Sequence, residues 1–242
     1  MNRLSKNSRQ GWDMMIGFPD CTYLAGSGAR WLYTKEYYEL PKEDREKVKH
    51  LDKYKNLDRW GLMEKALDFF RLLMNAPIHR IALENPVGVI STKVKKPDQI
   101  IQPWQFGHTA QKTTCLWVKN LPLLVPTNVV DKGEFVTMGN GSKMPKWYSD
   151  CYKLSPKERA EKRSKTFKGI AEAMADQYTI LDTDSRIINR LPKDIRILIA
   201  CEESGAVRDA FLRLGYVNTY SCDLKPNPHP NHIQGDVRLI LT

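Results

Sequence analysis

The chain carries, at residues 197–205, the sequence Ile197-Leu198-Ile199-Ala200-Cys201-Glu202-Glu203-Ser204-Gly205. An apolar run such as residues 196–200, which ends in a polar loop, is typical of a buried parallel strand. Residues 206–214 (AVRDAFLRL) predict a helix closed by Gly215, and residues 217–222 predict another strand, which ends at Asp223. A strand, a helix and a strand in succession predict a unit whose two strands lie parallel.

A second unit of the same kind lies near the start of the chain. Residues 12–18 (WDMMIGF) are mostly apolar and end at a proline, residues 60–74 repeat apolar side chains at helical spacing, and residues 78–83 are again strand-like. Cys21 and Glu84, which follow the two strands, are therefore expected on one face of the sheet. The two units together predict an α/β fold with a doubly wound, mostly parallel sheet.

Weaker patterns fill the rest of the chain. Residues 36–58 are densely charged and predict a surface helix or loop. Residues 114–119 and 121–125 predict a hairpin or a pair of short strands. The other segments are, in order, a turn-rich region at 131–156, a basic segment at 157–165, a helix at 166–177, a connector at 178–194 and a short strand at 232–234.

Length and composition predict one globular domain over residues 1–242, since 41% of the side chains are hydrophobic and 27% are charged. Lys and Arg (38) exceed Asp and Glu (28), which gives a formal net charge of +10 and a pI near 9.3. This excess suits a polyanion such as nucleic acid, bound through its phosphates. Excess lysine that only keeps the protein soluble would give the same composition.

The five cysteines are an odd number, lie far apart and form no Cys-x-x-Cys pair. We therefore expect reduced thiols and no structural metal. No apolar run is long enough to cross a bilayer, and residues 1–10 are polar and basic, without the apolar core of a secretory signal. These features predict a cytoplasmic protein with no membrane partner.

Two short motifs after the first two apolar strands suggest a particular chemistry. They are Phe18-Pro19-Asp20-Cys21-Thr22 and Leu83-Glu84-Asn85-Pro86. Carbon 5 of a pyrimidine is a poor nucleophile until something adds to carbon 6, and a cysteine thiolate is suited to that addition. An acid beside ring nitrogen 3 must then stabilise the charge that develops. Cys21 is the candidate nucleophile and Glu84 the candidate acid.

These motifs resemble those of the cytosine carbon-5 DNA methyltransferases, and more closely the small phage-type members of that family. The family's Pro-Pro-Cys and Glu-Asn-Val correspond to Pro19-Asp20-Cys21 and Glu84-Asn85-Pro86. The flanking residues 22–31 and 97–108 are similar to the phage-type group as well. The resemblance implies a Rossmann-like, S-adenosylmethionine-dependent enzyme that flips a cytosine out of DNA. If the chain is phage-encoded, its location is the host cell cytoplasm; no obligate protein partner is inferred.

The order of the motifs is that of a circularly permuted member of this family. A catalytic half at 11–130 comes first, and a cofactor-binding half at 195–242 comes last. Between them lie a variable, DNA-reading region at 131–165, a helix at 166–178 that packs on the cofactor half, and a connector at 179–194 without a counterpart. The resemblance therefore implies a fold cut between the third and fourth strands of the usual order, whose present ends lie close together.

The same resemblance assigns residues to the cofactor. The loop formed by Cys201, Glu202, Ser204 and Gly205 would approach the methionine moiety, although the family loop usually has more glycines. Asp223 would bind the ribose hydroxyls, as acids do in dinucleotide folds, and Asp236 would contact adenine. Pro19 is assigned to the same site. Lys112, in Gln111-Lys112-Thr113-Thr114, is the nearest equivalent of a Gln-x-Arg-x-Arg element beside the target base and is a further catalytic candidate.

Two other functions fit parts of the sequence. Methylation of an exocyclic amino group uses an Asn/Asp/Ser-Pro-Pro-aromatic motif, but Phe18-Pro19-Asp20-Cys21 lacks the aromatic fourth residue and the polar first one. A catalytically impaired or dead DNA-binding relative is favoured by the glycine-poor loop and by Asp20. A carboxylate beside Cys21 is expected to raise the pKa of the thiol and slow its attack, unless a cation offsets it.

Overall fold

The computed structural model describes residues 11–139, 141–182 and 189–241. At its centre is a seven-stranded sheet in the order β11-β10-β9-β1-β2-β4-β3. The strands are β1 (Met14–Gly17), β2 (Arg80–Pro86), β3 (Gln99–Ile101), β4 (Thr114–Lys119), β9 (Ile197–Ala200), β10 (Thr219–Asp223) and β11 (His232–Gln234). The strands from β11 to β2 run parallel, and β4 is antiparallel to both its neighbours. The predicted α/β class with a mostly parallel sheet is confirmed.

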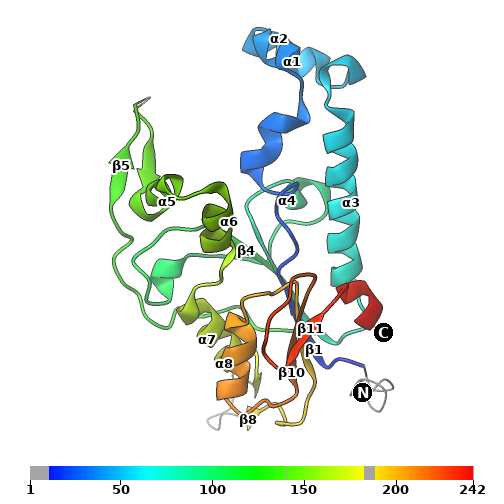
Figure 1. Cartoon of the computed structure of the whole chain (residues 1–242), viewed down its shortest axis with the longest axis vertical. Coiled ribbons are helices and arrows are strands. Elements are labelled where there is room, and N and C mark those ends of the chain that lie inside the picture. Colours follow the sequence, from blue (N-terminus) through cyan, green and yellow to red (C-terminus); the bar gives the residue numbers. More distant parts are fainter. Residues whose placement is uncertain (1–10, 140, 183–188, 242) are drawn as a thin grey trace.

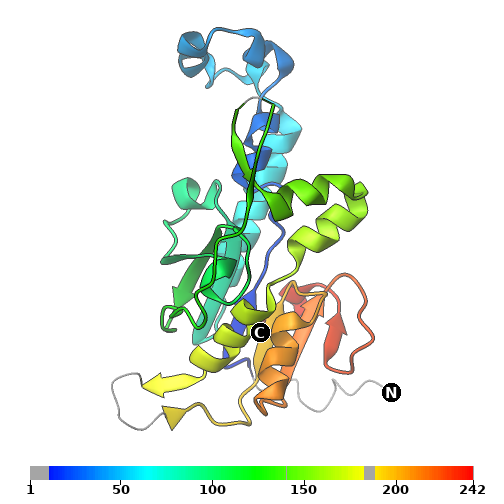
Figure 2. The same ribbon diagram turned by 90° about the vertical axis from the view of Figure 1, so that its left-hand side faces the viewer.

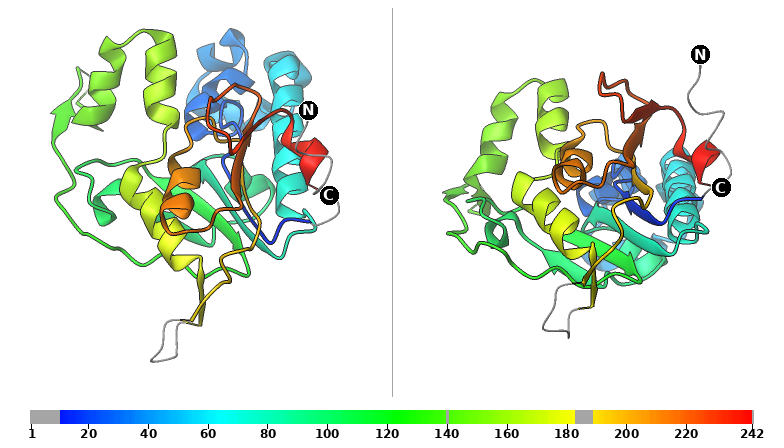
Figure 3. Two further views of the ribbon diagram at one scale, coloured as in Figure 1. Left: turned by 60° about the horizontal axis from the view of Figure 1, so that its bottom comes forward. Right: turned by 90° about the horizontal axis from the view of Figure 1, so that it is seen from below.

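Helices cover both faces of the sheet (Figure 3). Helix α3 (Leu57–Met74) packs on one face, and α7 (Lys168–Gln177) and α8 (Ala206–Arg213) pack on the other. The alternation of side chains along β1 explains this arrangement, because Met15 joins the core under α3 whereas Met14 and Ile16 join the core under α7 and α8. The side chains of Met14, Met15 and Ile16 are all completely buried.

The first strand of the chain pairs with strands from both halves. On one side β1 pairs with β2, and on the other it pairs with β9, where Met14 lies opposite Ile197. Near the other end of the chain, the carbonyl of Ile240 accepts a hydrogen bond of 2.6 Å from the indole Nε1 of Trp12. Residues 12 and 240 are therefore neighbours in space.

Two lobes extend from this core (Figure 1). Short helices α1 (Lys35–Glu39), α2 (Lys42–Val48) and η3 (Asp52–Tyr54) sit at the far end of α3, as expected for a charged surface segment. The second lobe, which we call the variable lobe, comprises β5 (Phe135–Thr137), β6 (Lys143–Pro145), α5 (Lys146–Asp150), η5 (Cys151–Lys153) and α6 (Pro156–Ser164). The β5–β6 hairpin and α5 lie in a region whose sequence predicted only turns.

The predicted strand at residues 121–125 is wrong, since β4 pairs with β2 and β3 and the chain leaves the sheet after it. Asn120 adopts a left-handed conformation (φ 53°), which ends the strand. Beyond it, side chains replace a neighbouring strand: Gln99 bonds the N–H and C=O of Leu124, and Gln177 bonds those of Val125. The backbone is satisfied without a ladder.

The predicted connector at 178–194 contains paired strands in part, β7 (Ile180–Asp182) and β8 (Asn189–Arg190); residues 183–188 lie outside the described residues. The Arg190 guanidinium holds this segment to α7 by a 2.5 Å contact with Asp176. The remaining short elements are η2 (Gly26–Leu32), α4 (Ile90–Lys93), η4 (Pro103–Gln105) and η6 (Val237–Ile240). Within the described residues, no helix has the length and apolar character needed to cross a membrane.

Candidate active site

A cavity of about 1120 Å³ opens at the carboxyl ends of β1, β9, β10 and β11. Its wall includes Phe18 and Asp20 after β1, Cys201 to Ser204 after β9, Cys222 to Lys225 around the end of β10, and Gly235 to Arg238 after β11. The other side is formed by Lys157, Ala160, Glu161 and Ser164 of α6 and by Lys165 and Thr166 after it. In an open sheet wound in two directions, the crevice outside the carboxyl ends of the central strands is where ligands bind. The cavity therefore marks the candidate site.

The loop that carries Cys21 is held by short-range hydrogen bonds. The Asp20 carboxylate accepts from both the backbone N–H (2.9 Å) and the hydroxyl (2.7 Å) of Thr22, and the carbonyl of Cys21 accepts from the N–H groups of Leu24 and Ala25. Asp20 thus closes an Asx turn around the cysteine. Cys21 is exposed, whereas Cys115, Cys151 and Cys222 are buried and Cys201 is half-buried.

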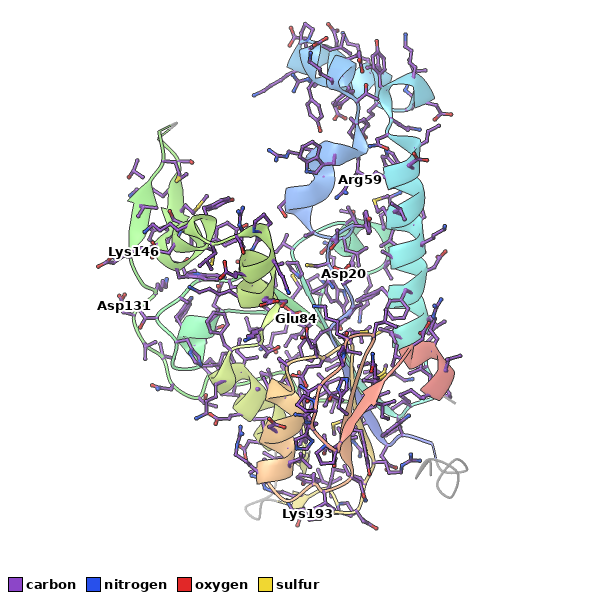
Figure 4. The ribbon with its side chains drawn as sticks, in the orientation of Figure 1. Asp20, Arg59, Glu84, Asp131, Lys146 and Lys193 are labelled. Carbon is purple, nitrogen blue, oxygen red and sulfur yellow. The ribbon has the colours of Figure 1, made fainter. Side chains whose placement is uncertain are left out.

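Glu84 lies inside β2 rather than after it, because β2 continues to Pro86 through pairing with β4. The next side chain, Asn85, is fully buried and donates a 2.7 Å hydrogen bond to the carbonyl of Pro19. This bond joins the strand that carries Glu84 to the loop that carries Cys21. Figure 4 shows Asp20 and Glu84 in the middle of the molecule.

The charges around Cys21 act in opposite directions. Desolvation raises the pKa of its thiol, and the carboxylates of Asp20 and Glu84 raise it further, whereas the ammonium of Lys112 lowers it. The expected effect of Asp20 on the Cys21 pKa is confirmed, and Lys112 is the cation that offsets part of it. The structure thus brings together Cys21, Glu84 and Lys112, the three residues predicted to be catalytic.

Burial raises the pKa of Glu84, against the opposing effects of Lys112 and of a hydrogen bond with the Thr114 hydroxyl. A carboxyl with a raised pKa holds its proton at higher pH and can donate it to a substrate atom. This is the behaviour expected of a general acid.

The residues predicted to hold a cofactor fall into two groups. Cys201, Ser204, Asp223 and Asp236 line the cavity with their neighbours. Cys201 has a left-handed backbone (φ 58°), and desolvation followed by the nearby Asp223 raises the pKa of its thiol to about 12. Cys201 is therefore a poor nucleophile.

The second group, Glu202, Gly205 and Pro19, has structural roles. Glu202 lines the cavity, but its carboxylate accepts from the N–H groups of Val207 and Arg208 at the start of α8, and burial raises its pKa to about 7. Gly205 has φ 74°, and a Cβ there would lie 2.1 Å from the guanidinium of Arg208. Pro19 is buried and is not part of the cavity wall; its carbonyl serves as the acceptor for Asn85.

Several residues at the site were not assigned from the sequence. Asn85 belongs to the second motif, but the sequence suggested no role for it; its buried Oδ1 has no hydrogen-bond partner among the described residues. Arg238 forms an ion pair with Asp236 at the cavity wall, and this pair lowers the pKa of Asp236. Lys157, Glu161 and Lys165 reach the wall from in and beside α6. Only the basic run at 157–165 gave any indication of such a contact.

No model of a known protein family matches the chain, and no curated protein or solved structure is similar to it. Among the described residues, no three His, Cys, Asp or Glu side chains are grouped so that they could hold a metal ion.

Proposed function

We propose that the chain is an S-adenosylmethionine-dependent methyltransferase that forms 5-methylcytosine in DNA. One observation carries the proposal: a thiol, a carboxyl with a raised pKa and a lysine lie close enough to act on one another, and the loop of the thiol borders a large cavity. Cys21, Glu84 and Lys112 are the three groups, and Asp20, the neighbour of Cys21, lines the cavity. A nucleophile, an acid and a cation are what covalent activation of a pyrimidine needs.

The groups have complementary roles in this reaction. The Cys21 thiolate would add to carbon 6 of cytosine, and the electron pair released toward ring nitrogen 3 would be stabilised by the proton of Glu84. Lys112 would favour the thiolate before the addition and offset negative charge on the ring after it. Once carbon 5 has taken the methyl group, a base or water would accept the proton from carbon 5, and elimination of the thiolate would restore Cys21 and the aromatic ring.

The cavity suits the cofactor in volume and in donor set. Asp223 ends β10 beside the central strands, and one of its carboxylate oxygens accepts from the N–H of Lys225, which orients the side chain. A carboxylate at the end of the second strand of such a unit is placed to accept from ribose hydroxyls. S-adenosylmethionine, when bound, would supply the methyl group as an electrophile for carbon 5. Cys201 and Asp236 would complete its surroundings.

The variable lobe supports DNA as the substrate. Residues 131–165 contain nine Lys or Arg and five Asp or Glu, so this lobe carries an excess of positive charge. Arg163 and Arg159 lie over the rings of Tyr148 and Tyr152, at 4.5 and 5.1 Å from the ring centres. The Trp147 indole donates to the carbonyl of Gln111, next to Lys112. Cationic and aromatic groups linked to the site suit a phosphate backbone and its bases.

The strand order supports a circular permutation. Read from β9, the parallel strands occur along the chain as β9, β10 and β11, and then β1 and β2. Their spatial order is then 3-2-1-4-5, that of a doubly wound nucleotide-binding sheet, with its switch point between β9 and β1. The contact between Trp12 and Ile240 brings the segment before the fourth strand of this order beside the segment after the third.

The test is transfer of labelled methyl from S-adenosylmethionine to DNA of mixed sequence, followed by nucleoside analysis. We expect labelled 5-methylcytosine from the wild type and none from Cys21→Ala. Label on an amino nitrogen that survives Cys21→Ala would instead favour an exocyclic-amino methyltransferase. In a separate calorimetric titration, Asp223→Asn is expected to weaken binding of S-adenosylmethionine about tenfold, whereas the cavity-wall variant Glu203→Gln is expected to bind as the wild type does.

A DNA-binding protein without catalysis is the second candidate, because desolvation, Asp20 and Glu84 all raise the pKa of Cys21. A smaller fraction of the thiol is then ionised at neutral pH. This candidate predicts that the wild type shifts DNA with or without S-adenosylmethionine and transfers no methyl group. Methyl transfer that depends on Cys21 would exclude it.

A further inference from the structure

Exposed aromatic rings lie beneath arginine side chains on the lobe at the far end of α3. Trp31 on η2 is 53% exposed, and the guanidinium of Arg30 lies over its ring, 4.5 Å from the ring centre. Tyr38 on α1 is 39% exposed, and the guanidinium of Arg45 on α2 lies 5.5 Å from the centre of its ring. Two ring–cation pairs thus come from three short helices.

The two pairs belong to one surface. Burial raises the pKa of the Tyr38 phenol, and the guanidinium groups of Arg45 and Arg30 act against that rise. Arg30 on η2 is therefore close enough to act on a side chain of α1. We call the surface formed by Arg30, Trp31, Tyr38 and Arg45 the ring patch.

Other rings form the core of this lobe. Tyr37 is only 7% exposed, and its ring stacks on that of Tyr33 at 4.2 Å and meets that of Tyr54 at 6.3 Å between centres. Tyr38 meets this core through an edge contact with Tyr37, at 5.2 Å, and otherwise leaves much of its ring exposed. Exposed rings that gather on one surface outside the core indicate that a partner binds there.

The arginines of the ring patch are not neutralised by acids, unlike most lysines of the lobe. The lysines that form ion pairs with acids of the same lobe are Lys35, Lys47, Lys49 and Lys55. Arg30 has no ion pair or hydrogen bond with any residue that the structure describes. Arg45 donates to the backbone carbonyls of Leu40 and Tyr38. Two positive charges beside two exposed rings suit an anion that itself carries planar rings.

Hydrogen bonds tie the ring patch to the loop of the proposed nucleophile. The carbonyl of Leu32, the residue after Trp31, accepts from the Trp60 indole on α3 at 2.8 Å. The adjacent Arg59 donates to the carbonyl of Thr22, in the loop of the proposed nucleophile, at 3.0 Å. In Figure 1 η2 lies between α3 and the variable lobe, and in Figure 2 the β5–β6 hairpin crosses in front of it. Both lobes thus rise from the same side of the core.

We propose that the ring patch binds unpaired bases of DNA beside the target cytosine. Bases would stack on Trp31 and Tyr38, and the guanidinium groups of Arg30 and Arg45 would pair with the phosphates that join them. Every base offers a ring face, so this contact needs no particular sequence, but in a duplex the neighbouring base pairs cover those faces. The inference rests on DNA as the partner in the proposed function, and not on catalysis.

The first test is DNA binding by the full chain, measured by fluorescence anisotropy with two labelled probes. One probe is a cytosine-containing duplex with a single-stranded thymidine extension, and the other is the same DNA with the extension paired to its complement. The paired probe carries more phosphates, so charge alone would favour it. We expect the probe with the unpaired extension to bind at least about fivefold more tightly. Equal affinity, or tighter binding of the paired probe, would overturn the proposal.

Variants then locate the contact. Trp31→Ala is expected to remove the preference for the unpaired extension, whereas Trp31→Phe keeps a ring and should keep most of that preference. Arg30→Gln should weaken binding and lower the salt dependence by about one phosphate contact. Arg213→Gln, which removes an exposed arginine at the end of α8, is the matched control and should bind as the wild type does. A preference that survives in Trp31→Ala, or that Arg213→Gln also loses, would contradict the assignment.

Methyl transfer by the same samples separates this inference from the proposed function. A wild type that prefers the unpaired extension through Trp31 but transfers no methyl group would support the ring patch and reject the enzyme. Methyl transfer without any such preference would support the enzyme and reject the ring patch. Absence of DNA binding would overturn both.

Discussion

The side-chain amide of Asn85 donates a hydrogen bond of 2.7 Å to the backbone carbonyl of Pro19. The two residues are 66 positions apart in the chain. Each lies close in sequence to a proposed catalytic residue, since Glu84 directly precedes Asn85 and Cys21 follows Pro19 by two residues. The bond is buried, so water cannot replace it. The bond therefore ties the loop of the proposed nucleophile to the strand of the proposed acid.

Replacing Asn85 with alanine should loosen this connection. We expect Asn85→Ala to lower the free energy of unfolding by about 1–3 kcal/mol, because the buried Pro19 carbonyl loses its donor. Methyl transfer should fall at least about tenfold, since Cys21 is no longer held against Glu84. Urea denaturation and turnover assays measure the two effects. Asn75→Ala, which removes an exposed amide at the end of α3, is the control; equal effects in both variants would contradict the positioning role.

The reactivity of Cys21 should respond to its neighbours with opposite signs. Asp20→Asn keeps an oxygen for the N–H and hydroxyl of Thr22 but removes the charge, so the pKa of Cys21 should fall and alkylation by iodoacetamide at pH 7 should speed up. Lys112→Met should raise that pKa and slow alkylation. Mass spectrometry of the Cys21 peptide follows the rate, with Lys35→Met as a distant control. Identical rates in Asp20→Asn and Lys112→Met would show that these charges do not act on the thiol.

Glu202 should make stability depend on pH. Burial raises its pKa in the folded protein to about 7, from a model-peptide value of 4.5, so the folded state binds the proton more tightly than the unfolded state does. Its contribution to stability is therefore complete below about pH 4.5 and is lost as pH rises through about 7.

Glu202→Gln removes this titration. Relative to Glu202→Gln, the wild type should lose at most about 3 kcal/mol of unfolding free energy as the pH rises from 4.5 to 8. Denaturation curves across that range measure this loss. Glu203 is an exposed neighbour that pairs with Lys225, and the control variant Glu203→Gln should retain the wild-type pH dependence. A difference that stays constant with pH would mean that Glu202 titrates alike in both states.

Tyr178→Phe should stabilise the protein. Its buried hydroxyl has no partner among the described residues, so removing it recovers a desolvation cost and we expect a gain of about 1 kcal/mol. Tyr216→Phe is the matched comparison, because its buried hydroxyl donates to the carbonyl of Leu191 at 3.1 Å, and its loss should cost about 1 kcal/mol. Thermal unfolding measures both variants. A loss of stability in Tyr178→Phe would indicate that its hydroxyl does have a partner.

The sequence predicted those parts of the fold that local pattern controls. The apolar period of residues 60–74 gave α3 apart from its first turn, and β11 lies where its three residues were expected. Long-range pairing decided the rest. Glu84 was expected after a strand, but Leu116 on β4 lies opposite it and extends β2. The error at residues 121–125 has a related cause, since glutamine side chains from distant elements satisfy that backbone.

The sequence predicted the candidate site only in part. Residue types at strand ends indicated Cys21, Glu84 and Asp223, because parallel strands bring their carboxyl ends to one edge. Partners within the site had no sequence pattern. The hydroxyl of Ser221 accepts from Arg208, which is buried within α8, and Asp236 pairs with Arg238 only because η6 begins between them. The part of the cavity wall that the variable lobe forms depends on packing between segments that lie far apart in the sequence.

The proposed reaction requires a covalent bond between the sulfur of Cys21 and carbon 6 of cytosine. Duplex DNA that contains 5-fluorocytosine tests it directly, because carbon 5 then carries no proton to lose and the thiol cannot be eliminated after methyl transfer. We predict a denaturation-resistant complex of protein and DNA that forms only with S-adenosylmethionine, maps to the Cys21 peptide by mass spectrometry and is absent in Cys21→Ser. Failure to form this complex in the wild type, while methyl transfer to ordinary DNA proceeds, would contradict the claim, as would a complex that persists in Cys21→Ser.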